Sequence, residues 1–160
     1  MNTPRSTPDW ILEAVSAVTL AAAIGDVALH WRILPQRIPI HFGASGDPNG
    51  WGDKNMLLLL LSSTIGMAIL LTIAETRQRL INVPLNVDRD SPQVRSILRS
   101  MAIVMKAVII LAFFWITDAT MRTALGEAHG LGRAFLPLFL GGTLAPAIYY
   151  AVKLKRLPRK

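Results

Sequence analysis

Two acidic residues stand inside apolar runs of this sequence, each with a basic residue four positions further on. Asp26 precedes His30, and Asp118 precedes Arg122, so each pair lies on one face if its run is helical. Acids within a membrane-spanning segment are costly to insert and mark ion pairs or functional sites. Asp26 and Asp118 are therefore candidate intramembrane functional residues, and the structural alternative is that either acid pairs with Lys54 or an arginine.

The apolar run that contains Asp118 also carries a lysine, Lys106. Arg95, Arg99 and Lys106 follow one another at spacings of four and seven, and so fall near one helix face. One interpretation is a cationic stripe whose side chains extend to lipid headgroups. The other is an ion pair of Lys106 with Glu13 or Glu75, which both lie at inner helix ends.

The three histidines fall on one predicted side of the membrane, yet they have no spacing typical of metal ligands. Three imidazoles and a carboxylate can bind Zn²⁺, but the sequence contains no H-x-x-x-H pattern. It contains no cysteine either, hence no thiol nucleophile or thiolate ligand. No G-x-S-x-G motif is present. We therefore predict a non-enzymatic protein with no metal and no cofactor.

The most polar stretch of the chain is LPQRIPIHFGASGDPNGWGDK, residues 34–54. Pro35 and Pro39 fix φ and favour an extended arm. The following GASGDPNGWG is typical of successive turns, in which glycines supply positive φ. Trp31 and Trp51 flank the segment and suit a membrane interface. Residues 31–54 should thus form a non-helical arm over the helix ends.

The composition and the apolar runs define the elements that position these residues. The chain of 160 residues is 52% hydrophobic and 17% charged, which indicates a membrane protein. Runs long enough to span a bilayer lie at about 10–29, 56–74, 101–121 and 134–152. We predict an all-α integral membrane protein with four transmembrane helices in a single domain, 1–160. A retained first helix is expected, and a cleaved signal peptide is the alternative.

The distribution of cations predicts the orientation of these spans. Loop 76–100 should lie in the cytoplasm, where Ile81–Val87 is extended and the third helix begins near Ser91 and Pro92. Eleven cations then lie inside, namely Arg5, Arg77, Arg79, Arg89, Arg95, Arg99, Lys153, Lys155, Arg156, Arg159 and Lys160. Five lie outside, namely Arg32, Arg37, Lys54, Arg122 and Arg133. Both termini should be cytoplasmic and the arm outside; nothing indicates nucleic-acid binding.

The motif L-P-x-x-I-P-x-H-F followed by G-x-P-x-G-W-G-x-K resembles a bacterial family of small integral-membrane proteins of unknown function. Its domain also forms the amino-terminal part of the Sdp toxin immunity protein. One departure is Asn49, where the family more often has an acid, so Asp47 would have to replace that acid. The segment Asn82–Pro84 is similar too. The matching positions of the motif are Leu34, Pro35, Ile38, Pro39, His41, Phe42, Gly46, Trp51, Gly52 and Lys54.

The resemblance implies a bacterial inner-membrane protein of the immunity or sensor type. The immunity protein protects a cell from a secreted membrane-active toxin and sequesters a repressor, but it is longer than this chain. We expect the arm to recognise an extracellular peptide or lipid, and the cytoplasmic side to contact a partner or a second copy. The alternatives are a small transporter using Asp26, Asp118 and Lys106, and an enzyme at the outer surface. The motif residues expected to bind ligand or shape the arm are Pro35, Pro39, His41, Phe42, Gly46, Asp47, Trp51 and Lys54.

Two of these residues have specific predicted contacts. Lys54 directly precedes the second apolar run, so its ammonium should pair with Asp26 or Asp118 and tether the arm. In an extended arm, side chains alternate, so Ile38, Ile40 and Phe42 would share the buried face. His41 would then project to the other side and hydrogen-bond Asp47 or Asp53, orienting the turn for ligand binding. The alternative is that its ring hydrogen-bonds the turn backbone and only fixes the shape of the arm.

Overall fold

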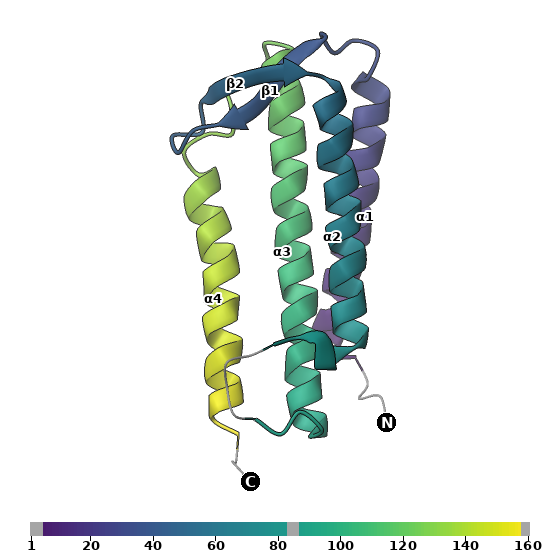
Figure 1. The fold of residues 1–160 in the computed structure, drawn as a ribbon, viewed down its shortest axis with the longest axis vertical. Helices are drawn as coiled ribbons and strands as arrows, with labels where there is room; N and C mark the ends of the chain where they lie inside the picture. The colour runs from purple at the N-terminus through teal and green to yellow at the C-terminus, as the bar shows by residue number, and fades with distance from the viewer. Residues whose placement is uncertain (1–4, 83–86, 158–160) are drawn as a thin grey trace.

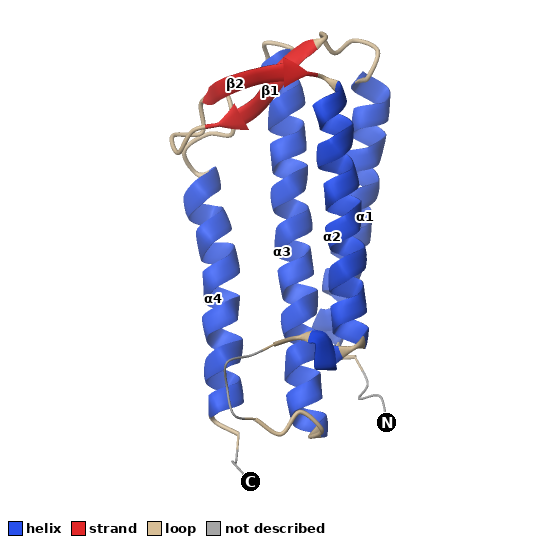
Figure 2. Cartoon of the chain, in the orientation of Figure 1, coloured by secondary structure: helices blue, strands red, loops and turns tan. Residues whose placement is uncertain are grey.

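The computed structural model describes residues 5–82 and 87–157. Four long helices lie side by side, and a small hairpin covers one end of them (Figure 1, Figure 2). We call this the hairpin end and the opposite one the distal end. The elements in chain order are α1 (Thr7–His30), β1 (Arg37–Phe42), β2 (Pro48–Asp53), α2 (Asn55–Thr76), the 3₁₀ turn η1 (Gln78–Leu80), α3 (Pro92–Ala124) and α4 (Phe135–Lys155).

All four helices are long and apolar enough to cross a membrane, which confirms the predicted fold class of a multi-pass membrane protein. Helix α1 begins with a capping box, in which Ser6 and Asp9 bond each other's backbone N–H groups. Helix α3 begins at Pro92 as predicted, although the Ser91 side chain makes no capping hydrogen bond. The expected extended stretch lies partly in residues 83–86, which, like Arg159 and Lys160, are outside the described residues.

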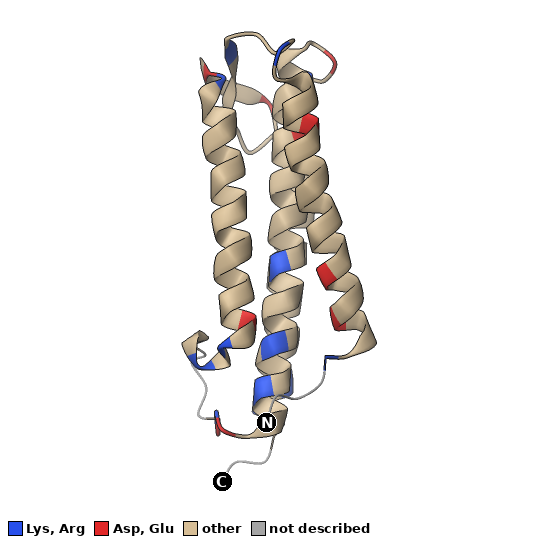
Figure 3. Ribbon diagram, turned by 90° about the vertical axis from the view of Figure 1, so that its right-hand side faces the viewer, with Lys and Arg blue, Asp and Glu red and all other residues tan. Residues whose placement is uncertain are grey.

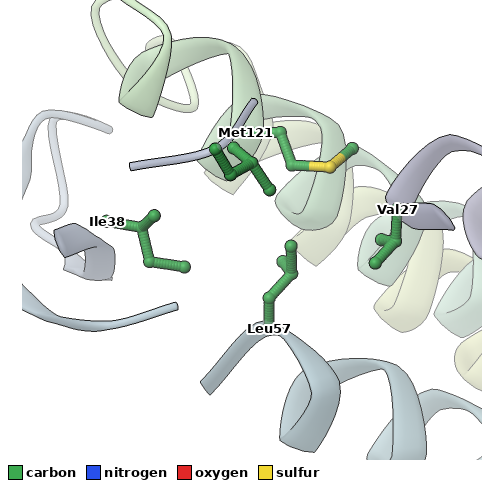
Figure 4. Packing of buried hydrophobic residues seen from close by; sticks show 5 residues of the cluster. Val27, Ile38, Leu57 and Met121 are labelled. Carbon is green, nitrogen blue, oxygen red and sulfur yellow. The ribbon is translucent and has the colours of Figure 1, made fainter. Parts of the chain in front are cut away.

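Helix α3 is the centre of the bundle, because α1, α2 and α4 each pack against it. It is also the most buried helix, whereas α4 (Phe135–Lys155) buries only Tyr150 and Leu154. At the hairpin end, Val27 of α1, Leu57 of α2 and Met121 of α3 meet Ile38 of the hairpin (Figure 4). A second apolar cluster joins α3 to α4 through Leu98, Tyr150 and Leu154. Ile38 thus fixes the hairpin to three helices at once.

The predicted non-helical arm is a hairpin, and of the successive turns expected over residues 43–52 only residues 44–46 form a turn, whereas residues 48–52 belong to strand β2. Strand β2 pairs antiparallel with β1, with Ile38 opposite Gly52. A Cβ atom at Gly52 would lie 2.7 Å from the Ile40 Cδ1 atom, and one at Gly50 would lie 3.0 Å from the His41 Cβ atom. These glycines therefore leave room for the Ile40 and His41 side chains of β1 to cross the partner strand. Composition alone does not distinguish such glycines in a strand from glycines in a turn.

The predicted alternation along β1 is also wrong. Register shifts between Pro39 and His41 and between His41 and Phe42 interrupt the ladder. Ile38 and the adjacent Pro39 are both buried, whereas Ile40 is 49% exposed. An irregularity of this kind turns a strand so that neighbouring residues no longer project to strictly opposite sides.

Candidate functional site

A cavity of about 480 Å³ lies between strand β1 and helices α2 and α3. Its lining is mainly apolar, and the side chains of His41, Ser63 and Thr120 add polar groups at its wall. Strand β1 supplies five consecutive residues, so the hairpin is one wall of the cavity. The lining residues are Ile38, Pro39, Ile40, His41, Phe42, Met56, Leu57, Leu59, Leu60, Ser63, Ile116, Thr120 and Leu131.

The hairpin turn is held by the connection between α3 and α4. The Leu131 N–H donates to the Gly46 carbonyl at 2.8 Å. Gly46 has a φ of +88°, and a Cβ atom there would lie 2.6 Å from the Gly132 carbonyl oxygen. Gly46 is thus required for close backbone approach. Sequence reasoning found Gly46 but missed its partner loop, whose signal is the glycine-rich spacing of Gly126, Gly130 and Gly132.

His41 bonds a residue other than the predicted acids. Its Nδ1 atom makes a hydrogen bond with the Asn49 Oδ1 atom across the hairpin. Asp47 instead accepts from the Ser45 hydroxyl at 2.7 Å, and Asp53 accepts from the Asn55 N–H at 2.8 Å. The prediction of an Asp47 or Asp53 partner is therefore wrong, because both acids satisfy local turn and helix-start donors. Asn49 stands where the resembling family more often has an acid.

Lys54 has different partners from those predicted. Its Nζ atom donates to the Trp31 carbonyl at 3.3 Å and lies 4.9 Å from the centre of the Trp31 ring. No ion pair of Lys54 with Asp26 or Asp118 occurs between these described side chains. The start of α2 is nevertheless tethered to the end of α1, through a carbonyl and a cation–π contact instead of a carboxylate.

We expect Lys54→Met to weaken this tether by about 0.5–2 kcal/mol, the range of a cation–π contact. Lys54→Arg should largely retain it, since a guanidinium also donates to the carbonyl and stacks on the ring. Hydrogen exchange at the Lys54 amide, which donates to the Gln36 carbonyl at 2.9 Å, is the measurement. Equal exchange in the Met and Arg variants would contradict a tether made by the charge.

The two intramembrane acids line one polar cavity at the hairpin end, about 270 Å³ in volume, between α1 and α3. Asp26 pairs with His30 at 2.9 Å. Asp118 lies 4.0 Å from Arg122, which also lies 3.9 Å from Glu127. The predicted i, i+4 pairs are thus present and adjacent. Within residues 5–82 and 87–157, no His, Asp and Glu side chains group in an arrangement suited to a metal ion.

Lys106 is buried in a network of charged side chains. Its ammonium lies 2.8 Å from Glu13 and 2.9 Å from Glu75, and donates to the Thr72 hydroxyl at 3.1 Å. Arg5 pairs with Glu75 at 2.6 Å. The predicted ion pair with Glu13 or Glu75 is confirmed for both acids.

The interpretation of a headgroup-directed stripe is wrong for two of its three members. Lys106 is only 3% exposed because it turns toward α1 and α2. Arg95 pairs with Asp90 at 2.7 Å, and Arg79 pairs with the same carboxylate at 2.9 Å. The two guanidiniums lower the pKa of Asp90, that of Arg79 more strongly. Arg95 thus connects the start of α3 to the loop after α2.

Residues 18–65 match a family model described as a domain of unknown function (DUF1648). An uncharacterized protein of Archaeoglobus fulgidus is 44% identical over 50 residues, which cover 31% of this chain and 27% of that protein. The chain thus matches about a quarter of that relative's length. No solved structure matches. The family match runs from within α1 through the hairpin into α2, and it confirms the resemblance to a domain of unknown function.

Proposed function

We propose that this protein is a non-enzymatic receptor of a bacterial inner membrane, of the immunity or sensor type. The hairpin and the cavity beneath it bind the apolar part of an extracellular peptide or lipid. The observation that carries this proposal is the cavity of about 480 Å³ walled by β1, α2 and α3. Its size lies in the range of small-molecule sites, and its apolar lining with a few polar groups is typical of them.

The polar groups of the cavity support binding over catalysis. Ser63 donates its hydroxyl to the Leu59 carbonyl of its own helix at 2.8 Å. His41 is hydrogen-bonded to Asn49 in the hairpin. A serine nucleophile needs a base within hydrogen-bond reach, whereas Ser63 is engaged within its own helix and His41 is engaged across the hairpin. They are suited to orient a ligand headgroup or a peptide amide.

The proposed orientation of the protein in the membrane rests on the excess of cations in the connections at the distal end. Loop 76–91 and the end of α4 carry most of them, among the described residues Arg77, Arg79, Arg89, Lys153, Lys155 and Arg156. The positive-inside tendency then assigns the distal end to the cytoplasm and the hairpin to the outside. A ligand from outside the cell would therefore meet the hairpin first.

Photocrosslinking in native membranes tests the proposal. A benzoylphenylalanine at Ile40, which lines the cavity, should form one discrete adduct that mass spectrometry identifies as an extracellular peptide or lipid. The matched control is Ile33, an exposed isoleucine before the hairpin that does not line this cavity. The same adducts from both positions would contradict a specific site.

A matched pair of serines provides a test by obstruction. Ser63 lines the cavity and Ser62 does not, yet both are exposed and donate to the carbonyl four residues earlier. We expect Ser63→Phe to obstruct the cavity and reduce the Ile40 adduct at least tenfold, a cost of about 1.4 kcal/mol. Ser62→Phe should leave the adduct unchanged. Equal yields in the two variants would contradict binding inside the cavity.

A second candidate function is ion translocation, favoured by the polar cavity that contains Asp26 and Asp118 and by the buried Lys106 network. The polar cavity lies between α1 and α3 toward the hairpin end, and the Lys106 network joins α1, α2 and α3 toward the distal end. Proteoliposomes loaded with a pH-sensitive dye separate the two functions. Proton flux in the wild-type protein that stops in Asp118→Asn would favour translocation. A receptor carries no flux in the wild-type protein or in Asp118→Asn.

A further inference from the structure

Four charged side chains from four segments form the buried network near the distal end. Arg5 precedes α1, Glu13 belongs to α1, Glu75 to α2 and Lys106 to α3. In Figure 3, acidic positions (red) and basic positions (blue) lie on neighbouring helices in the part of the bundle toward the distal end. Two cations and two carboxylates give a net charge of zero. The network therefore needs every member to remain charge-balanced away from water.

The members of this network differ in their access to water. Glu75 and Lys106 are 1% and 3% exposed, whereas Glu13 is 21% and Arg5 is 26% exposed. Arg5 also stacks on the ring of Trp10, an exposed residue of the first helix turns, with 4.8 Å to its centre. Arg5 is thus the cation at the solvent edge of the network and covers the most buried carboxylate.

Withdrawal of Arg5 would leave Glu75 with one cation shared between two carboxylates. An uncompensated negative charge in the interior is strongly unfavourable. A proton from the solvent restores neutrality, because protonated Glu75 has no charge and can donate its O–H to a neighbouring oxygen. Withdrawal of the arginine and uptake of a proton therefore compensate each other.

We propose that Arg5 and a proton compete for the Glu75 carboxylate, so that Arg5 is released from the bundle as one proton is taken up. The charged groups facing the Glu75 carboxylate are Arg5, Glu13 of α1 and Lys106 of α3. The side-chain amide of Gln78 in η1 donates to the backbone carbonyl of Glu75. Release then increases as the pH falls. With the distal end in the cytoplasm, as proposed above, this device couples the cytoplasmic pH to the contact of Arg5 with the bundle, independently of any ligand at the hairpin.

Infrared spectroscopy of the full chain in lipid nanodiscs tests the exchange through the C=O stretch of a protonated carboxyl. We expect Arg5→Gln to gain the signal of one protonated glutamate near pH 7, which Arg5→Gln/Glu75→Gln loses. Arg5→Lys keeps the cation and should not gain the signal. The matched control is Arg77→Gln, which removes an exposed arginine just after α2 and should not gain it either.

The release itself is measured by the distance between two spin labels. The native chain has no cysteine, so labels at Thr7→Cys, two residues after Arg5 at the start of α1, and at Leu80→Cys in η1, both exposed, report on the start of α1 relative to the 3₁₀ turn that follows α2. In the otherwise unaltered chain a longer distance should appear as the pH falls from about 8 to about 5. With Glu75→Gln added, the longer distance should be present at every pH.

Three outcomes would overturn the proposal. The first is an Arg5→Gln protein without the protonated-carboxyl signal, which would show that both carboxylates stay ionised. The second is a signal removed by Glu13→Gln instead of Glu75→Gln. The third is an Arg5→Gln protein that does not fold in nanodiscs, since a proton would then be unable to replace the guanidinium.

Discussion

Lys106→Met is expected to destabilise the folded protein by about 3–5 kcal/mol, the range observed when one partner of a buried ion pair is removed. The ammonium is 3% exposed and contacts Glu13, Glu75 and Thr72 from two other helices. Methionine has a similar length, so the loss reflects charge and hydrogen bonds more than a cavity. Reversible unfolding in mixed detergent measures it.

The pH dependence and the double variant separate charge from packing. Protonation of a carboxyl removes the uncompensated charge, so the loss in Lys106→Met should shrink at acidic pH. Lys106→Met/Glu75→Gln leaves one cation with one carboxylate and should recover most of the stability. Lys155→Met, at an exposed lysine of α4, should change the stability by no more than about 0.5 kcal/mol. A Lys106→Met protein as stable as Lys155→Met would contradict the network.

Gly130→Ala is expected to detach the hairpin from the loop between α3 and α4. Gly130 has a φ of +134°, and a Cβ atom there would overlap the Gly46 carbonyl oxygen. That oxygen accepts the Leu131 N–H at 2.8 Å, so the added methyl group breaks the contact between the two loops. We expect a loss of more than about 3 kcal/mol, above the strain of an unusual backbone conformation alone.

Gly132→Ala is the matched control, because it separates the strain of a positive φ from the steric overlap of the added methyl group with the Gly46 carbonyl oxygen. Gly132 has a φ of +77°, but a Cβ atom there would meet no atom within 4 Å. It should therefore cost only about 1–2 kcal/mol of left-handed strain. Hydrogen exchange at the Leu131 amide should rise strongly in Gly130→Ala and weakly in Gly132→Ala. Equal effects would show that backbone strain, and not the lost contact between the loops, causes the destabilisation.

The helices could be predicted from the sequence because each apolar run is as long as a bilayer is thick. The start of α3 followed from Ser91 and Pro92, and α3 indeed begins at Pro92. The pairing of β1 with β2 could not be predicted, since Gly50 and Gly52 favour turns locally. Their role depends on the Ile40 and His41 side chains that cross them, which is a tertiary contact.

The sequence indicated which charged residues belong to the candidate sites, but it did not indicate which of them pair with one another. The inner positions of Glu13 and Glu75 made them candidate partners of Lys106, yet the rotation of each helix decides which groups meet. Arg5 was missed because it precedes α1 and follows no helical spacing. For Lys54 a carboxylate partner was predicted, but its ammonium donates to the backbone carbonyl of Trp31. Every residue has such a carbonyl, so the residue types do not indicate this partner.

The proposed ligand site is tested most directly by native mass spectrometry of the protein extracted from its own membrane. The receptor proposal predicts one additional mass retained on the wild-type chain and on Ser62→Phe, and lost from Ser63→Phe, whose side chain obstructs the cavity under the hairpin. A wild-type chain that carries no additional mass, or a mass retained equally by both variants, would contradict it.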